Sequence, residues 1–261
     1  MKITIIGAGN MGGAIARGLA KGTLVEEKQI TVTAHTQKTL DAIHASNPQI
    51  HVTLDNVQAV KDADLVVLAV KPWVVGPVIE QLRQHLDLSK QVIVSVVAAV
   101  SFDDLRQMLK AEKAALFRVI PNTAISVGES LTAVAASGAT DEQVQLVLSI
   151  FNEMGTAVLI EERLMGAATA LCSCGIAYAL RFVKASVDGA VELGLYPAQA
   201  KTMAAQTLLG AATLLMANDS MPDDEIYKVT TPGGLTIRGL NAMEANGFSA
   251  AVMAGLRASM K

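Results

Sequence analysis

Apolar and polar positions follow two different patterns along this chain, and the change comes near residue 160. In the first part, short apolar runs rich in β-branched residues alternate with segments of helical periodicity. The runs lie at 2–6, 30–34, 65–70 and 91–97. Near-continuous apolar runs of this kind are typical of parallel strands that are buried on both faces. The pattern therefore predicts a doubly wound α/β sheet over residues 1–160.

Beyond residue 160 the strand-like runs stop, and long segments rich in Ala, Leu and Met are interrupted by Gly. This predicts an all-α second domain over residues 161–261. Two uncharged stretches, 164–180 and 202–218, are shorter than the roughly 20 residues that a membrane span needs, and both contain polar residues. We therefore expect helices that are covered in a homodimer formed through the C-terminal domain, and no membrane partner.

Composition narrows the classes of partner and the compartment. Lys and Arg number 21 against 24 for Asp and Glu, and the resulting net charge of −3 excludes the basic surface that a nucleic-acid partner requires. Aromatic residues make up only 3% of the chain, so we expect a core of Ala, Val, Leu, Ile and Met. The apolar run at the N-terminus is too short for a secretory signal, which predicts a cytoplasmic protein.

The chain has two cysteines, Cys172 and Cys174, which are separated by one residue. Such a pair cannot supply a disulfide framework or a four-ligand zinc site, so we predict no metal. Buried cysteine usually behaves as a small apolar side chain, and we expect that role here. The alternative is that the two thiols act as a redox switch or bind a metal ion.

A glycine-rich turn follows the first predicted strand. Gly7, Gly9 and Gly12 form the pattern G-x-G-x-x-G between a strand-like run and a segment of helical periodicity. In a Rossmann domain the first glycine permits a tight turn, the second lets the backbone approach a pyrophosphate, and the third allows close helix packing. Because a helix N-terminus offers free N–H groups, we expect this turn, with Asn10 and Met11, to bind a dinucleotide. An ordinary glycine turn is the alternative.

The end of the second predicted strand bears on the choice of cofactor. NAD-binding domains usually carry an acidic residue about 20 positions after the glycines, which accepts a bond from the ribose 2′-hydroxyl. Here residues 34–38 read Ala-His-Thr-Gln-Lys and include no carboxylate. His35, Thr36 and Lys38 are therefore predicted to favour the 2′-phosphate of NADP(H), with NAD(H) less favoured. The alternative for His35 is a loop histidine without a ligand, and the alternative for Lys38 is a solvent-exposed helix residue.

Two further strand ends lie where cofactors bind, because ligands of doubly wound folds occupy the carboxyl ends of the parallel strands. One apolar run leads into Lys71 and Pro72, and a later one leads into Asn122 and Thr123. We expect a catalytic role for Lys71 on the nicotinamide side, with an exposed loop lysine as the alternative. The predicted cofactor contacts at these ends are Ala69, Val70, Lys71, Pro72 and Asn122.

A polar turn precedes a predicted helix near the C-terminus, where residues 230–234 read Thr-Thr-Pro-Gly-Gly. Hydroxyls and free backbone amides at a helix N-terminus suit a carboxylate. A plain helix cap is the alternative. The predicted anion contacts are Thr230, Thr231, Gly233 and Gly234.

Five sequence motifs together relate the whole chain to one known family. They lie at 7–15, 69–72, 118–123, 169–178 and 230–237. Together they resemble the pyrroline-5-carboxylate reductase family over essentially the whole length. The resemblance implies NAD(P)H-dependent reduction of a cyclic imino acid in proline biosynthesis. It also implies a helical domain interleaved between two subunits, in a homodimer or a higher homo-oligomer.

One loop departs from the family pattern. The family's carboxylate-binding loop usually reads Ser-Gly-Ser-Gly-Pro-Ala-Tyr, whereas residues 172–178 read Cys-Ser-Cys-Gly-Ile-Ala-Tyr. The changed loop leaves two alternatives open: a reductase of another small carboxylated imine or carbonyl, and a catalytically weakened, regulatory NADP(H)-binding paralogue. The substrate contacts that the resemblance assigns to this loop are Ser173, Cys174, Gly175, Ile176 and Ala177.

The resemblance also assigns a role to Thr236, whose position matches the hydroxyl that faces the imine nitrogen in the family. All four histidines lie in the nucleotide-binding half, so none is available in the helical half as a general acid. A protonated imine already carries the positive charge that an acid would otherwise provide. We expect Thr236 to orient the substrate as a catalytic hydrogen-bond donor. A first-turn hydroxyl bonded to its own backbone is the alternative.

Overall fold

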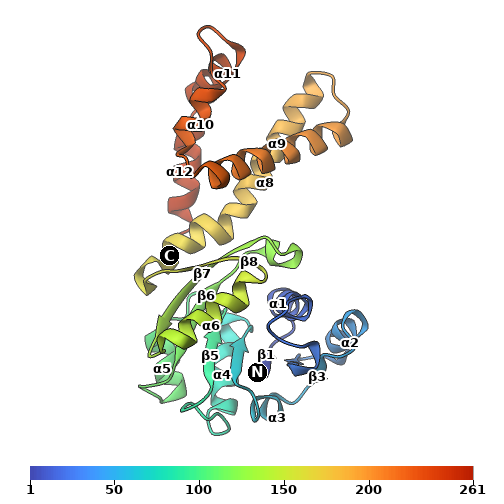
Figure 1. Ribbon diagram of the computed structural model, residues 1–261, viewed down its shortest axis with the longest axis vertical. Coiled ribbons are helices and arrows are strands. Elements are labelled where there is room, and N and C mark those ends of the chain that lie inside the picture. Colours follow the sequence, from blue (N-terminus) through green and yellow to red (C-terminus); the bar gives the residue numbers. More distant parts are fainter. Residues whose placement is uncertain (261) are drawn as a thin grey trace. The chain divides into compact units, whose positions relative to one another are not determined.

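The computed structural model describes residues 1–260, and its first compact unit is built on one mixed sheet (Figure 1). Eight strands are hydrogen-bonded in the order β3-β2-β1-β4-β5-β6-β7-β8. β6 and β7 are antiparallel, and the other neighbouring pairs are parallel. The strands are β1 (Ile3–Ile6), β2 (Ile30–Thr33), β3 (His51–Thr53), β4 (Leu65–Leu68), β5 (Val92–Ser95), β6 (Leu116–Ile120), β7 (Ser130–Ser137) and β8 (Gly155–Leu159). The predicted doubly wound α/β domain is confirmed.

Helices cover both faces of this sheet. Successive side chains of a strand point to opposite faces, and the two cores follow that alternation. Ile5 of β1 lies in one core with Ile15 of α1, whereas Ile6 lies in the other core with Ile79 of α4. The strands read as continuous apolar runs because both of their faces are buried. The helices of this sheet are α1 (Asn10–Lys21), α2 (Gln37–Ser46), α3 (Asn56–Val60), α4 (Pro72–Leu82), α5 (Phe102–Leu109) and α6 (Asp141–Asn152).

The first unit continues to Ser173, beyond the boundary predicted near residue 160. After β8 the chain forms a 3₁₀ turn (Glu162–Leu164), α7 (Met165–Ala168) and a π-helical turn (Thr169–Cys174). Met165 is buried in the core with α4 and α5. Arg118 of β6 donates from Nη1 to Glu162 Oε1 at 2.8 Å, and the Phe102 N–H donates to the same oxygen at 2.8 Å. These contacts with residues far back in the chain attach the start of the helical region to the sheet.

The second unit, residues 174–259, consists of helices, as predicted. Within it, the Tyr178 hydroxyl donates to the Gly255 carbonyl at 3.2 Å and joins α8 to α12. Phe182 and Phe248 meet edge to face in the same place, with ring centroids 6.4 Å apart. The helices are α8 (Gly175–Glu192), α9 (Pro197–Asn218), α10 (Pro222–Lys228), α11 (Leu235–Ala245) and α12 (Phe248–Ala258).

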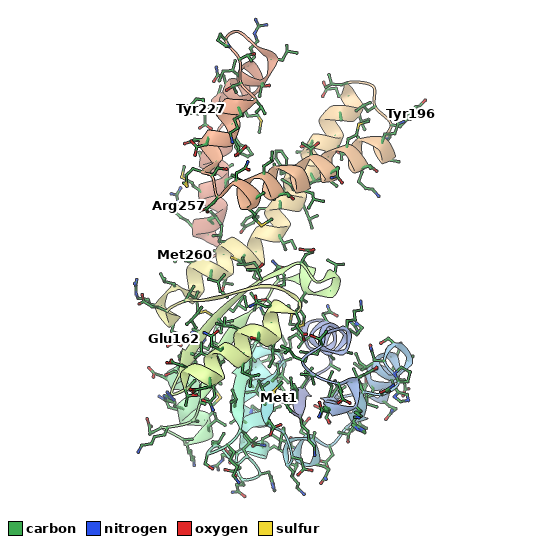
Figure 2. The ribbon with its side chains drawn as sticks, in the orientation of Figure 1. Met1, Glu162, Tyr196, Tyr227, Arg257 and Met260 are labelled. Atoms are coloured by element: carbon green, nitrogen blue, oxygen red, sulfur yellow. The ribbon has the colours of Figure 1, made fainter. Side chains whose placement is uncertain are left out.

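Side chains of the second unit project outward from its helices (Figure 2). Ala200 is the only buried residue among those described in this unit. Large apolar side chains are open to solvent: Leu180 is 63%, Leu209 59% and Met216 76% exposed. Large exposed apolar patches are typical of surfaces that contact another protein or a membrane.

A continuous helix from Glu162 to Glu192 is long and apolar enough to cross a membrane, judged by length and composition. It includes the stretch 164–180, which by itself is shorter than a membrane span. Its second half carries the charged residues Arg181, Lys184 and Asp188. One such helix is weak evidence for a membrane span, because helices of proteins outside membranes pass the same test.

A strained alanine follows β5. Ala99 has φ of 61°, in the left-handed region that side chains with a Cβ disfavour by about 1–2 kcal/mol. We expect Ala99→Gly to raise the unfolding temperature by about 1–3 °C, because relief of this strain exceeds the extra entropy of glycine in the unfolded chain. Calorimetric melting tests this. Ala98→Gly is the matched control, since that residue has no positive φ and should lose stability; a lower melting temperature for Ala99→Gly would show that the conformation costs nothing.

Candidate functional site

The three glycines of the turn between β1 and α1 have different geometric roles. Gly7 has φ of 104°, and a Cβ there would lie 2.8 Å from the Ala69 carbonyl oxygen. A Cβ on Gly12 would lie 1.9 Å from the Gly7 carbonyl oxygen, so this position is filled by the turn itself. A Cβ on Gly9 would meet no atom within 4 Å. The space beside Gly9 is therefore where a ligand can approach the backbone.

Helix α1 points its N-terminus into that space. Gly9 is its N-cap and supplies no side-chain cap, and the first turn contains no acidic residue. The first N–H groups of a helix lack partners within the helix, and the helix dipole adds partial positive charge there. The turn therefore presents donors to an anion such as a pyrophosphate.

A cleft of about 1170 Å³ opens beside this turn, at the carboxyl ends of β1, β2 and β4. No acidic residue lines it, whereas the cations Arg17 and Lys71 do. Its size, its lack of carboxylates and the free backbone at Gly9 fit a dinucleotide with its phosphates. The predicted cofactor residues that line the cleft are Gly7, Gly9, Asn10, Met11, His35, Thr36, Ala69, Val70, Lys71 and Pro72.

Three predicted cofactor residues do not line the cleft. Gly12 lies behind the turn, against Gly7. Lys38 is exposed on the first turn of α2, outside the lining. Asn122 is 8% exposed, and its side chain is engaged: Oδ1 accepts from the Ala124 N–H at 2.9 Å, and Nδ2 donates to the Cys172 carbonyl at 3.3 Å. Its neighbour Thr123 lines the cleft instead.

Two threonine hydroxyls lie close together after β2, at the start of α2. Thr36 caps α2, and its Oγ1 accepts from the Thr39 N–H at 3.4 Å. The hydroxyls of Thr36 and Thr39 are 2.9 Å apart. Because one of them donates to the other, one hydroxyl proton of the pair is free for a ligand.

Lys71 begins α4 as its N-cap, with Pro72 at the first helical position. Its side chain is exposed at the rim of the cleft and makes no ion pair with any described residue. The amine is therefore free to meet a ligand in the cleft. Its predicted catalytic role remains a prediction.

Sequence reasoning missed several cleft residues. They are Arg17, Thr39, Leu54, Asn56 and Ser126, among others. Arg17 follows Gly13 by four residues on α1, a spacing that places both on one face of a helix. Asn10 and Ala14, which also line the cleft, have the same helical relation to Arg17, and this spacing is the signal in the sequence that relates Arg17 to the cleft.

In the second unit, the turn 230–234 leads directly into α11. Gly234 is the N-cap and offers no side-chain cap, and the first turn of α11 has no acidic residue. The Gly234 N–H donates to the Thr231 carbonyl at 2.9 Å, and the Thr230 hydroxyl donates to the Tyr227 carbonyl at 3.2 Å. The exposed Thr236 hydroxyl bonds to no described residue. The helix N-terminus and this hydroxyl therefore present free donors to a carboxylate.

Glu225 secures the segment just before that turn. Its Oε1 accepts from Lys228 Nζ at 2.7 Å, Ser220 Oγ at 2.6 Å and Asn218 Nδ2 at 3.0 Å. The bonds from Lys228 and then from Ser220 and Asn218 lower the pKa of this carboxyl to about 2. Glu225 therefore stays ionised at neutral pH and links the end of α9 to α10.

The predicted substrate loop is helical. Ser173 and Cys174 end the π-helical turn, and Gly175, Ile176 and Ala177 begin α8. Backbone N–H groups inside a continuous helix bond to carbonyls of the preceding turn, so their use by a substrate would need that turn to open. Assignment of substrate contacts to this loop remains a prediction.

Both cysteines are free and half-buried. Burial raises the pKa of the Cys172 thiol, which disfavours the reactive thiolate. Within residues 1–260, no group of three or more His, Cys, Asp or Glu side chains could hold a metal ion.

Comparisons with known proteins cover both parts of the chain. The family profile described as pyrroline-5-carboxylate reductase dimerisation matches residues 162–261, and that of NADP oxidoreductase coenzyme F420-dependent matches residues 2–99. Pyrroline-5-carboxylate reductase of Methanosarcina acetivorans is 36% identical over 99% of this chain and 95% of its own length. Pyrroline-5-carboxylate reductase 1 of Dictyostelium discoideum is 35% identical over 97% of this chain, which spans only 48% of that relative. The crystal structure of Plasmodium falciparum pyrroline carboxylate reductase with NADP bound is similar at a TM-score of 0.88 and 26% identity, over 99% of this chain and 95% of that one.

Proposed function

This chain belongs to the pyrroline-5-carboxylate reductase family, and from that premise we propose that it reduces 1-pyrroline-5-carboxylate to L-proline with NADPH. The observation that carries the proposal is a cleft without carboxylates beside an open Gly9, in a chain that matches these reductases over nearly its full length. Each unit contributes one requirement of the reaction. The first offers a dinucleotide site, and the second offers a free helix N-terminus for the substrate's carboxylate.

The proposed reaction depends little on general acid or general base side chains of the protein. NADPH supplies the hydride when bound. The carbon of a protonated C=N bond accepts that hydride, the π electron pair becomes the nitrogen lone pair, and water then protonates the amine. The protein contributes orientation, which requires the reacting atoms to lie about 3–3.5 Å apart.

We assign binding roles to groups of each unit separately. The N-terminus of α1 holds the pyrophosphate, and Lys71 lies at the nicotinamide side of the cleft. The N-terminus of α11, with Thr231 and Gly233, anchors the carboxylate. Thr230 and Gly234 join it only by releasing their bonds to the Tyr227 and Thr231 carbonyls. The Thr236 hydroxyl accepts from the N–H of the protonated imine and donates to the lone pair that forms on this nitrogen as the hydride adds to the carbon. Residues 173–177 complete the substrate contacts.

NADPH absorbance tests the proposed reaction. Purified protein should oxidise NADPH fastest with 1-pyrroline-5-carboxylate, and more slowly with piperideine carboxylate and simple 2-keto acids. A faster rate with one of the other compounds would identify a different reductase on the same scaffold. If the protein binds NADPH but reduces none of these compounds, the regulatory alternative replaces the enzyme.

We propose a homodimer formed through the helical domain, residues 161–261, and located in the cytoplasm. The support is the exposed apolar surface of α8 and α9 together with the match of residues 162–261 to a dimerisation profile. A monomer would leave Leu180, Leu209 and Met216 in water. Covering them in a second copy stabilises the helices by about 25 cal/mol per Å² of apolar surface removed from water.

This assembly predicts a stable dimer or larger homo-oligomer at nanomolar concentration, because the helical domain has little core of its own. Sedimentation velocity at decreasing concentration is the measurement. A replacement such as Leu209→Glu should weaken assembly and reduce helicity together, whereas Glu112→Gln, at an exposed position of the first unit, should leave both unchanged. A folded monomer at nanomolar concentration would contradict the proposal.

A further inference from the structure

Arg17 of α1 lines the cleft, and its side chain lies near α2. Its Nη1 is 3.4 Å from the point that a Cβ on Gly13 would occupy. Ile43 Cδ1 of α2 is 3.3 Å from the same point, and the Ala8 carbonyl oxygen is 3.6 Å from it. The guanidinium therefore reaches back along α1, toward the glycine turn and the second helix.

The glycine turn is hydrogen-bonded to the end of β2, and Arg17 lines the same cleft as residues that follow this strand. The Ala8 N–H donates to the Thr33 carbonyl at 2.7 Å, so the turn is bonded to the last residue of β2. The chain continues from Thr33 into His35 and Thr36, which line the cleft together with Arg17 and Thr39. Four polar side chains from α1, the β2 end and α2 thus line one cleft.

The hydrogen-bonding capacity of this group is not used up within the protein. The Thr36 and Thr39 hydroxyls share one bond, which leaves one proton to donate outward. Arg17 forms no ion pair with any residue in the described part of the chain. The first turn of α2 contains no acidic residue, and its N-terminal dipole adds positive potential.

Charge decides what kind of ligand this end of the cleft suits. A guanidinium is always ionised, has a planar set of donors that matches a phosphate, and is more weakly hydrated than an ammonium group. No carboxylate of the lining opposes it. The chemistry is that of a site for a phosphate dianion.

We propose that Arg17 selects NADP(H) over NAD(H) by binding the ribose 2′-phosphate, together with the hydroxyls of Thr36 and Thr39. This inference rests on the proposed dinucleotide function of the cleft. The discriminating cation comes from α1, instead of from the segment after β2 where the deciding residue usually lies. Lys38, which lies in that segment, is outside the lining.

Calorimetric titration of the full-length protein with four compounds tests the proposal: NADP⁺, NAD⁺, adenosine 2′,5′-bisphosphate and AMP. Arg17→Gln should weaken binding of NADP⁺ and of the bisphosphate by about 10- to 100-fold, the usual loss for a charge-assisted bond to phosphate. Binding of NAD⁺ and AMP should change less than about twofold, because neither has a 2′-phosphate. Arg17→Lys should recover part of the loss.

Lys21→Gln is the matched control, since Lys21 is one helical turn further along α1, exposed and outside the cleft. It should leave all four affinities unchanged. The proposal is overturned if Arg17→Gln weakens NAD⁺ as much as NADP⁺, if it weakens neither, or if Lys38→Gln produces the selective loss. These titrations need no substrate, so a wild-type protein that binds NADP⁺ but reduces no imine would remove the proposed function and leave this test intact.

Discussion

Gly9→Val is expected to weaken NADPH binding by at least about 100-fold while the unfolding temperature changes by less than about 2 °C. Gly9 has φ of −68° and ψ of −166°, an extended conformation that valine readily adopts. A Cβ at this position meets no atom within 4 Å, so the folded chain accommodates it. The branched side chain then occupies the space through which a pyrophosphate must reach the N–H groups of α1.

Gly12→Ala is the contrasting variant for this prediction. A Cβ at Gly12 would lie 1.9 Å from the Gly7 carbonyl oxygen, so the turn and α1 must move apart. We expect a loss of at least about 2–3 kcal/mol in the free energy of unfolding, as for other overpacked sites. Fluorescence titration with NADPH and thermal melting of both variants separate the two effects. Wild-type affinity in Gly9→Val would mean that phosphates bind elsewhere.

Thr236→Val is expected to lower kcat by about 10- to 100-fold and to leave NADPH affinity unchanged. Valine has nearly the same shape as threonine but lacks the hydroxyl, so the change removes one donor from the N-terminal turn of α11. One hydrogen bond to a transition state is worth about 1–3 kcal/mol, which corresponds to that range of rates. Because Thr236 is exposed in the chain, stability should not change.

Thr236→Ser completes this experiment, since serine retains the hydroxyl and should keep most of the turnover. Steady-state kinetics with the best substrate of the panel give kcat and KM, and titration gives the affinity for NADPH. Equal turnover of the valine variant and the wild type would make Thr236 an ordinary helix residue. Loss of NADPH affinity in the valine variant would point to unfolding of the helical domain.

The nucleotide half of the molecule could be predicted well from local patterns. Apolar runs such as 65–70 indicate buried parallel strands, and β4 forms within that run. The glycine turn was recognisable because backbone sterics alone require glycine at Gly7, whose φ is 104°. Most cofactor residues predicted next to these strands line the cleft, because parallel strands bring their carboxyl ends to one edge.

The sequence predicts the helices of the second half, but it says less about which of their residues contact a substrate. Small apolar residues indicate helices, but most residues of α9 are exposed within the described part of the chain. The resemblance assigns the family's loop to substrate contacts, whereas the structure has residues 169–174 in a π-helical turn. Whether this segment is a loop or a helix depends on backbone hydrogen bonds between successive turns, and a sequence motif does not show those bonds.

The sequence by itself determined the buried strands β1, β2, β4 and β5, the glycine turn after β1 and the absence of a carboxylate after β2, because each depends on residues that are neighbours in the chain. The tertiary structure alone decided that Asn122 bonds to the Cys172 carbonyl, 50 residues away. It alone decided that Arg118 donates a hydrogen bond to Glu162, 44 residues away. This contact lies within the first unit, which extends beyond the predicted boundary. It also placed Arg17, and not Lys38, in the cleft. The direction of a long polar side chain is set by the elements that pack around it, and only the folded chain brings those elements together.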